Sequence, residues 1–428
     1  MQTAEQTRSP QSCRGHLPDG ALHSLPLDRV SIPQDILDIR DKERSNPLEW
    51  KGQFSPQLVE AILGFYSDGA TTVLDPFVGS GTVLLETARR GLVPLGVEVN
   101  PAAYHLAAFY ELVRTPGPER DAILGTAREL VARMTGTQGP LFASVQHPSS
   151  SPAHVLRSAW ARAKDAEPGG GLSRYLAALL VLCDISKGEL KVDRLRKAHT
   201  HLSSLLNTLP FRPNCDVRVR LGDARATGVE SRSVDLIVTS PPYVNVYNYH
   251  QKYRGSVESM GWDVLAAARS EIGSNRKHRG NRVLTVIQFC MDMADVFAEM
   301  ERVLKPGGSA VVVVGRESMV RKTRFFNGEM LAEVASTATG LKLCLRQERV
   351  FLNRFGQHIY EDILHLSRPR RSKVLPRGRR HEHARSVAKR VLEDALRSCP
   401  DESRADIGSA LIRLETVQPS PMAAEHDE

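Results

Sequence analysis

Apolar and polar positions in the first part of the chain switch repeatedly between helical and strand-like spacing. Residues 56–65, "PQLVEAILGF", place apolar side chains at helical spacing after a proline, which predicts a helix. The apolar run at 71–74 predicts a buried strand, and 82–90 predicts the helix that follows it. A strand over 92–100 and a helix over 101–113 continue the pattern. This alternation is typical of a parallel α/β sheet.

The alternation pauses over residues 115–210, where the pattern is largely helical apart from a Ser/Pro/Gly-rich break at 146–171. We interpret 115–210 as a helical insertion in the sheet. The later elements that the pattern predicts are strands at 217–223, 234–238, 309–315, 343–353 and 361–367, and a helix at 284–304.

The same pattern divides the chain into segments. Residues 1–45 are polar and proline-rich, which predicts a flexible N-terminal arm. Residues 46–114 and 211–367 should form one α/β domain around the insertion. Residues 368–428 are basic and then charged, and we expect them to form a tail.

Composition and charge narrow the class of protein. The chain is 41% hydrophobic and 25% charged, as globular proteins are. No apolar run approaches the roughly 20 residues of a membrane span, and the N-terminus lacks the apolar core of a signal peptide, so we expect a cytoplasmic protein. A net charge of +8 favours a polyanionic partner. The cysteines form no CxxC pair and the histidines no HExxH motif, so we expect no metal.

Residues 75–82, "DPFVGSGT", link the strand at 71–74 to the next helix. Gly79 and Gly81 permit a tight turn and the close approach of a ligand to the backbone. The lysine of a phosphate-binding loop and the third glycine of a dinucleotide loop are both absent. The plain alternative is an ordinary turn between a strand and a helix.

Three acids at the ends of predicted strands argue against an ordinary turn: Asp75, Glu98 and Asp223. Asp75 suits a cation better than a pyrophosphate. Glu98 lies about 20 residues after the glycine loop, where the acid that binds ribose hydroxyls belongs. Asp223 is suited to accept a hydrogen bond from an adenine amino group. A positively charged adenosyl ligand would satisfy all three acids, and S-adenosylmethionine (AdoMet) is one.

A stiff loop, "TSPPY" at 239–243, follows the predicted strand at 234–238. Prolines carry no N–H, so the Ser240 hydroxyl and the Pro241 carbonyl can accept hydrogen bonds from an external amine. Two acceptors on an exocyclic amino group favour a nitrogen whose lone pair points at an electrophile, which stabilises the transition state of methyl transfer. Tyr243 offers a face on which a flipped base could stack. A rigid surface turn is the alternative interpretation of Pro241 and Pro242.

Both motifs resemble those of the AdoMet-dependent amino-methyltransferase family. "LKPGG" at 304–308 and "KGQFSPQLV" at 51–59 add weaker similarities, and the resemblance spans about 46–367 outside the insertion. It implies a class I, Rossmann-like α/β fold whose seven-stranded, mostly parallel sheet has an antiparallel seventh strand. It also implies that Ser240, Pro241, Pro242 and Tyr243 are catalytic. The residues that it implies for AdoMet binding are Phe54, Asp75, Pro76, Phe77, Gly79, Gly81, Thr82, Glu98, Asp223 and Thr239.

Ser-Pro-Pro-Tyr is typical of the family members that methylate N4 of cytosine in DNA, whereas adenine-N6 enzymes more often carry Asp or Asn in place of the serine. We therefore expect a site-specific DNA cytosine-N4 methyltransferase, with adenine N6 as the alternative base. A cognate restriction endonuclease is a candidate partner, and the enzyme should associate with the nucleoid. Two further hypotheses are an RNA amino-methyltransferase and a nucleic-acid-binding module with an inactive methyltransferase fold. The chain contains no Pro-Cys dipeptide, which argues against cytosine-C5 chemistry.

Residues 250–283 follow the catalytic loop and are the candidate target-recognition loop for DNA. Cationic side chains there can bind phosphates or guanine edges. A solvated, flexible loop is the alternative. The basic stretch at 368–390 should add nonspecific, salt-dependent affinity. The residues that we expect to bind DNA are Lys252, Arg254, Arg276, Lys277 and Arg279.

Overall fold

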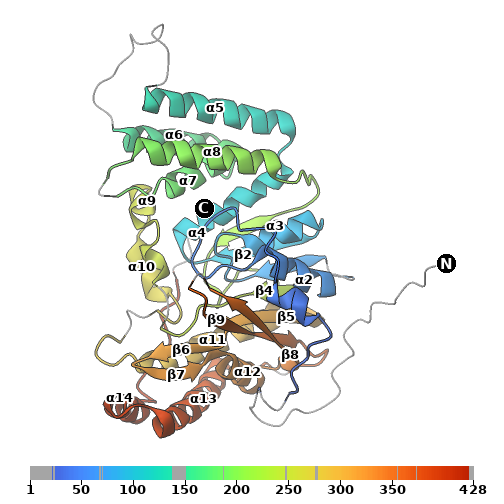
Figure 1. Ribbon diagram of the computed structural model, residues 1–428, viewed down its shortest axis with the longest axis vertical. Helices are drawn as coiled ribbons and strands as arrows, with labels where there is room; N and C mark the ends of the chain where they lie inside the picture. Colours follow the sequence, from blue (N-terminus) through green and yellow to red (C-terminus); the bar gives the residue numbers. More distant parts are fainter. Residues whose placement is uncertain are drawn as a thin grey trace, which may run out of the picture.

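A central β-sheet organises the molecule (Figure 1). The computed structural model describes residues 22, 25–66, 69, 71–136, 151–186, 188–245, 248–274, 278–353, 355–372 and 374–423. Within these residues, seven strands form one sheet in the order β3-β2-β1-β4-β5-β9-β8. Its strands are β1 (Thr72–Asp75), β2 (Val93–Glu98), β3 (Arg218–Leu221), β4 (Val234–Thr239), β5 (Leu304–Gly315), β8 (Lys342–Leu352) and β9 (His358–Ser367).

Strands β1 to β5 are parallel, whereas β9 is antiparallel to both of its neighbours, β5 and β8. The predicted class I methyltransferase sheet, with its antiparallel seventh strand, is therefore confirmed. The segment "LKPGG", expected as a turn before the fifth strand, lies inside β5 as an irregularity. Val234 pairs with Leu304 and Leu236 with Ser309, so residues 305–308 bulge out of the ladder.

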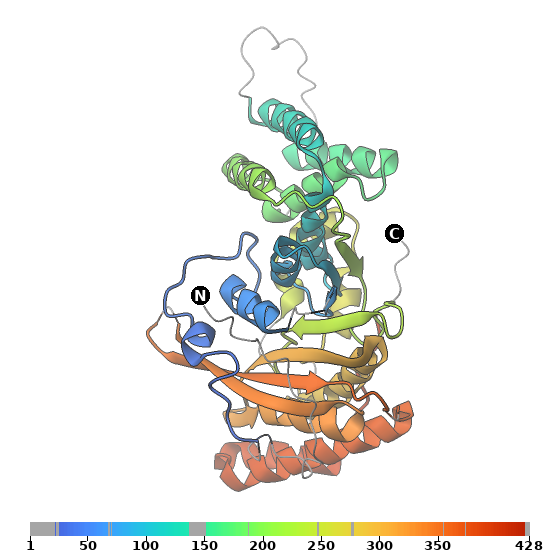
Figure 2. The same ribbon diagram turned by 90° about the vertical axis from the view of Figure 1, so that its right-hand side faces the viewer.

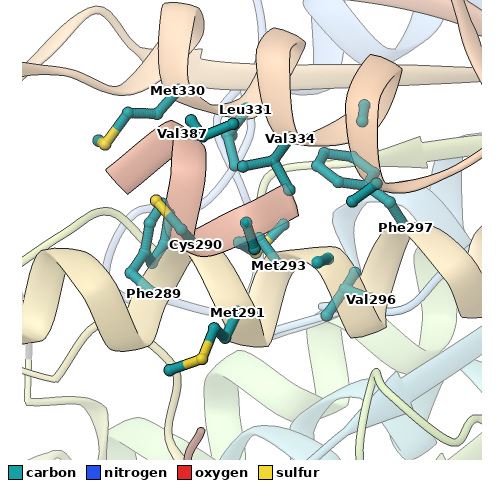
Figure 3. Close-up of a cluster of buried hydrophobic side chains, with 14 of the residues drawn as sticks. Phe289, Cys290, Met291, Met293, Val296, Phe297, Met330, Leu331, Val334 and Val387 are labelled. Atoms are coloured by element: carbon teal, nitrogen blue, oxygen red, sulfur yellow. The ribbon is translucent and has the colours of Figure 1, made fainter. Parts of the chain in front are cut away.

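Helices cover both faces of the sheet. Successive side chains of β5 point to opposite faces and identify the helices on each. Val311 and Val313 face one layer, which contains α1 (Gln34–Asp38) and α2 (Pro56–Tyr66). The intervening residues of β5 face the opposite layer, where α11 (Leu284–Val303) and α12 (Asn327–Ala338) lie. Figure 3 shows the core of that layer, in which Phe289, Met293 and Phe297 of α11 meet Leu331 and Val334 of α12.

The predicted insertion is helical and gathers at one end of the molecule (Figures 1 and 2). Its helices are α5 (Gly117–Thr135), α6 (Pro152–Ala166), α7 (Gly171–Leu182) and α8 (Val192–Thr208). Helix α6 was not predicted, because it lies in the Ser/Pro/Gly-rich break. The buried Arg120 of α5 donates to the Thr115 carbonyl at 2.9 Å and to the Leu209 carbonyl at 2.8 Å. One side chain therefore joins the two ends of the insertion.

Residues 368–428 were expected to form a tail. This prediction is wrong for the residues of the segment that the structure describes, which extend to 423. Helix α13 (Arg377–Ser398) packs beneath α11 and α12, and α14 (Asp401–Ile412) packs against α13. Charged residues dominate this segment and hide an apolar stripe at helical spacing, in which Val387 and Leu392 are fully buried. The buried Asp295 of α11 accepts hydrogen bonds from Arg377, Arg380 and His381 of α13.

The N-terminal arm is also more ordered than expected from residue 25 onward, and the candidate recognition loop contains short helices. Leu27 pairs with Arg346 of the edge strand β8, where the Asp28 N–H donates to the Arg346 carbonyl at 2.9 Å, and Leu37 of α1 is fully buried. Residues 1–21 lie outside the described residues. The candidate recognition loop contains η4 (Tyr249–Gln251), α9 (Arg254–Ser259) and α10 (Val264–Ser270). The other elements are α3 (Thr82–Arg89), α4 (Pro101–Ala108), η2 (Phe109–Arg114), β6 (Glu317–Val320) and β7 (Thr323–Phe326).

Candidate active site

A cavity lies at the carboxyl edge of the sheet, beyond the ends of β1, β2, β3 and β4. Asp75, Glu98 and Asp223 line it, together with Ser240 of the loop after β4. Open α/β sheets bind their ligands at this edge, because the loops that follow parallel strands meet there. The other predicted site residues that line the cavity are Phe54, Pro76, Phe77, Gly79, Thr82 and Pro242.

The glycine loop owes its shape to two left-handed backbone conformations, with φ of 54° at Gly79 and 90° at Gly81. A Cβ atom at Gly81 would lie 2.6 Å from the Tyr110 ring, so this position requires glycine. The Gly79 N–H donates to Glu98 Oε2 at 2.9 Å, which fixes the loop against the end of β2. Gly81 does not line the cavity; it precedes the first turn of α3.

Asp75 and Glu98 form a buried acidic pair on the cavity wall. Asp75 Oδ1 accepts from the Phe77 N–H at 3.0 Å and from the Thr239 hydroxyl at 2.6 Å. Glu98 accepts from the Gly79 N–H and from the Asn100 N–H, each at 2.9 Å. Burial raises the pKa of each carboxyl to about 7, and the charge of Asp75 adds to the rise at Glu98.

A cationic ligand with donor groups fits this pair. Within the described part of the chain, no cationic side chain is among the groups that shift the pKa of Asp75 or of Glu98. Buried carboxyls without a counter-charge are unfavourable when ionised, so a positive ligand would stabilise the ionised form. Each carboxylate oxygen has two acceptor positions, and the bonds from Gly79 and Asn100 occupy one on each oxygen of Glu98. Ribose hydroxyls and the positive charge of AdoMet match these properties.

Asp223 lines the same cavity but is engaged inside the protein. Oδ1 accepts from the Arg225 backbone N–H and from Arg225 Nε, at 3.0 and 2.8 Å. Oδ2 accepts from Arg225 Nη2 at 2.6 Å and from the Ala423 N–H at 3.0 Å. Burial alone would raise the pKa of Asp223, but its bonds to Arg225 outweigh burial and lower it. A carboxylate offers about four acceptor sites, so the expected bond to an adenine amino group does not fit this arrangement.

The catalytic loop begins at a residue that supports the acidic pair. Thr239 is fully buried and donates to Asp75, so it acts behind the cavity wall. Ser240 is half-buried, and its hydroxyl has no hydrogen-bond partner within the residues that the structure describes. Pro241 is buried and does not line the cavity. The Tyr243 ring also lies outside the lining and is so close to Gly315 that a Cβ atom there would come within 2.8 Å of it.

A pair of aromatic rings at the cavity was not predicted from the sequence. Trp50 and Tyr249 both line the cavity, and their rings lie nearly parallel, with an interplanar angle of 15° and centroids 6.5 Å apart. Trp50 also contacts Tyr253 and the Lys252 ammonium. The sequence signal was a tryptophan directly before "KGQF", but its contact with residues 249–253 depends on tertiary structure.

The predicted DNA-binding cations have different environments. Lys252 is mostly buried and pairs with Glu49 at 2.9 Å, and Arg254 pairs with Glu258 at 2.7 Å. Arg279 is exposed, whereas Arg276 and Lys277 lie outside the described residues. In the basic stretch at 368–390, many cations have acidic partners, as Arg379 has with Glu382. The charge available to a phosphate backbone is therefore smaller than the sequence indicates.

The described ranges contain neither a candidate membrane span nor a candidate metal cluster. No helix there combines the length and the apolar character needed to cross a bilayer. Likewise, no cluster of His, Cys, Asp or Glu side chains in these ranges could hold a metal ion.

Two sequence comparisons bear on the identity of the protein. Residues 9–109 match the family model N6_N4_Mtase, described as DNA methylase. A type II methyltransferase, M.MjaII of Methanocaldococcus jannaschii, is 34% identical over 67 residues, which is 15% of this chain and 13% of that protein. These matches support the predicted family, the AdoMet-dependent DNA amino-methyltransferases, and with it AdoMet as the cofactor.

Several solved structures resemble the chain at low identity. TrmN from Thermus thermophilus is 15% identical, with a TM-score of 0.30 over 74% of this chain and 50% of that one. The rRNA methyltransferase aviRa from Streptomyces viridochromogenes is 14% identical, with a TM-score of 0.29 over 82% of this chain and 96% of that one.

Proposed function

We propose that the protein is a site-specific DNA methyltransferase that transfers a methyl group from AdoMet to N4 of cytosine. The observation that carries the proposal is the shared cavity, which the acidic pair Asp75 and Glu98 and the loop residues Ser240 and Pro242 all line. One cavity can thus hold a cationic adenosyl cofactor beside the Ser240 hydroxyl, a predicted acceptor for an amino group. The serine at position 240 favours cytosine over adenine as the base.

The chain's own residues would act on the amine and on the cofactor. When bound, AdoMet supplies an electrophilic methyl group. Ser240 Oγ, which lines the cavity, would accept an amine hydrogen and help to point the nitrogen lone pair at that group, whereas the predicted second acceptor, the Pro241 carbonyl, belongs to a residue that does not line the cavity. Asp75 and Glu98 would hold the cofactor's charge and its ribose. Asp75 is almost fully buried, which keeps water from its carboxylate and strengthens its interaction with the cofactor's charge.

The target base has to leave the duplex to reach this cavity. Trp50 and Tyr249 line the cavity, so they offer aromatic surface to a flipped base, whereas the Tyr243 ring lies against Gly315. This arrangement favours Trp50 and Tyr249 over Tyr243 as the stacking surface.

Nucleoside mass spectrometry tests the proposal directly. The purified protein is incubated with AdoMet and unmethylated genomic DNA, and the digested DNA is searched for methylated nucleosides. We expect N4-methylcytosine from the wild type and little from Ser240→Ala, which should still bind AdoMet. N6-methyladenine would keep the mechanism and change the base. The absence of any DNA product from protein that binds AdoMet would refute the proposed substrate.

A further inference from the structure

A fully buried guanidinium, that of Arg225, lies behind the cavity, four residues after the end of β3. Arg225 Nε and Nη2 donate to the two oxygens of Asp223, and Nη1 donates to Asp292 Oδ1 of α11 at 3.0 Å. Neither Arg225 nor Asp292 lines the cavity. A buried cation needs both compensating negative charge and hydrogen-bond acceptors for its N–H groups. The position of Arg225 therefore depends on all the groups that accept hydrogen bonds from it.

Residues 417–423, here called the C-terminal segment, complete that environment. The Ser420 and Pro421 carbonyls accept from Arg225 Nη1 and Nη2, each at 2.8 Å. Ser420 also donates its N–H and its hydroxyl to the two oxygens of Asp292, at 2.8 and 2.5 Å. The Ala423 N–H donates to Asp223 Oδ2 at 3.0 Å. The segment therefore contacts all three members of the buried ionic cluster.

The same guanidinium joins two walls of the cavity. One wall contains Asp223 and Ala224, and the other contains Ser270, Glu271 and Ile272. Arg225 bonds to Asp223 in the first wall, and its Nη2 donates to the Ser270 carbonyl in the second at 3.4 Å. A shift of Arg225 would therefore change the spacing between these walls.

We propose that the C-terminal segment is part of the cofactor site, although none of its residues lines the cavity. It acts through Arg225, a positioning residue that sets the spacing of the two walls and so the affinity for the adenosyl part of AdoMet. Without the segment, Nη1 of this guanidinium loses its carbonyl partner, and Nη2 keeps only the long bond to the Ser270 carbonyl and the bond to Asp223. Unpaired buried donors are unfavourable, so Arg225 would move and take Asp223 with it. The inference rests on the cofactor site of the proposed function.

Two truncated proteins test it. One ends at Val417 and lacks the contacts of the segment, whereas the matched control ends at Ala423 and keeps them. Binding of S-adenosylhomocysteine is measured by calorimetry. We expect the Kd to rise at least tenfold for the protein that ends at Val417 and less than twofold for the control. A merely structural role would reduce the fraction of folded protein, which lowers the binding stoichiometry and leaves the Kd unchanged.

A second measurement uses the full-length chain, in case the shorter truncation does not fold. Coupling between two sites is reciprocal, so the cofactor should also stabilise the segment. We expect S-adenosylhomocysteine to slow hydrogen exchange in a peptide that covers 417–423 at least threefold. Exchange that stays the same, or a folded truncation with an unchanged Kd, would refute the inference and leave the proposed function intact. Failure of the full-length protein to bind the probe would refute the cofactor site itself, and the inference with it.

Discussion

AdoMet binding should weaken as the pH falls below about 7, because the acidic pair then takes up protons. Burial raises the pKa of Asp75 and of Glu98 to about 7 in the ligand-free protein. A cationic ligand favours the ionised carboxylates. Above about pH 8 both groups are largely ionised and the affinity should be nearly constant. Below pH 7 each coupled carboxyl must release a proton before the cation binds.

The size of the effect follows from these pKa values. One pH unit below its pKa, a carboxyl is only about one-tenth ionised, which corresponds to about 1.4 kcal/mol. Between pH 8 and pH 6 the Kd for AdoMet should rise roughly tenfold if one carboxyl is coupled to binding, and roughly a hundredfold if both are.

Isothermal titration calorimetry of AdoMet binding at pH 6, 7 and 8 measures this directly. Asp75→Asn and Glu98→Gln should each bind more weakly at pH 8 and show a shallower pH dependence. Asp235→Asn is the matched control, because that carboxyl bonds to Thr71 and Lys305 at the opposite end of β4. A wild-type Kd that is the same at pH 6 and pH 8 would refute the coupling of these carboxyls to a cationic ligand.

Three further predictions concern the cavity and the core. Gly81→Ala should destabilise the protein by roughly 2 kcal/mol more than Gly91→Ala, as measured by urea denaturation. Both glycines have positive φ, but only at Gly81 would the added Cβ atom clash with a ring, that of Tyr110. Asp295→Ala should lower the free energy of unfolding by roughly 3 kcal/mol, since it leaves α13 cations without their buried partner, whereas the exposed Asp394→Ala should change it little. Trp50→Ala should raise the KM for DNA at least tenfold; an unchanged KM would remove Trp50 from the base-binding surface.

The sequence predicted the sheet and the acidic pair well, because both depend on local patterns. Strand ends in a parallel sheet share one edge, so Asp75 and Glu98 could be placed together without any tertiary information. The positions of the glycines followed from the turn that joins β1 to α3. These parts of the site are set by residues close together in the sequence.

The parts that could not be predicted depend on contacts between distant residues. Asp223 ends a strand as expected, but its acceptor sites are filled by Arg225 and by Ala423, which lies 200 positions away in the sequence. Trp50 approaches Tyr249 only after the sheet has formed. The helices of the C-terminal region were missed because charged residues dominate it and its apolar stripe packs on α11 and α12.

The contacts of Arg120 bear on whether the helices α5 to α8 could be replaced in evolution or by engineering. The helices α5 to α8 leave the sheet and return to it at one place, where Arg120 holds Thr115 and Leu209 together. The module also shares a hydrophobic core with α4 and η2, in which Tyr175 of α7 lies against Phe109. A replacement module would therefore need both a bridge between its two ends and an apolar face for α4 and η2, while the strands that carry Asp75 and Glu98 could keep their sequence and their register.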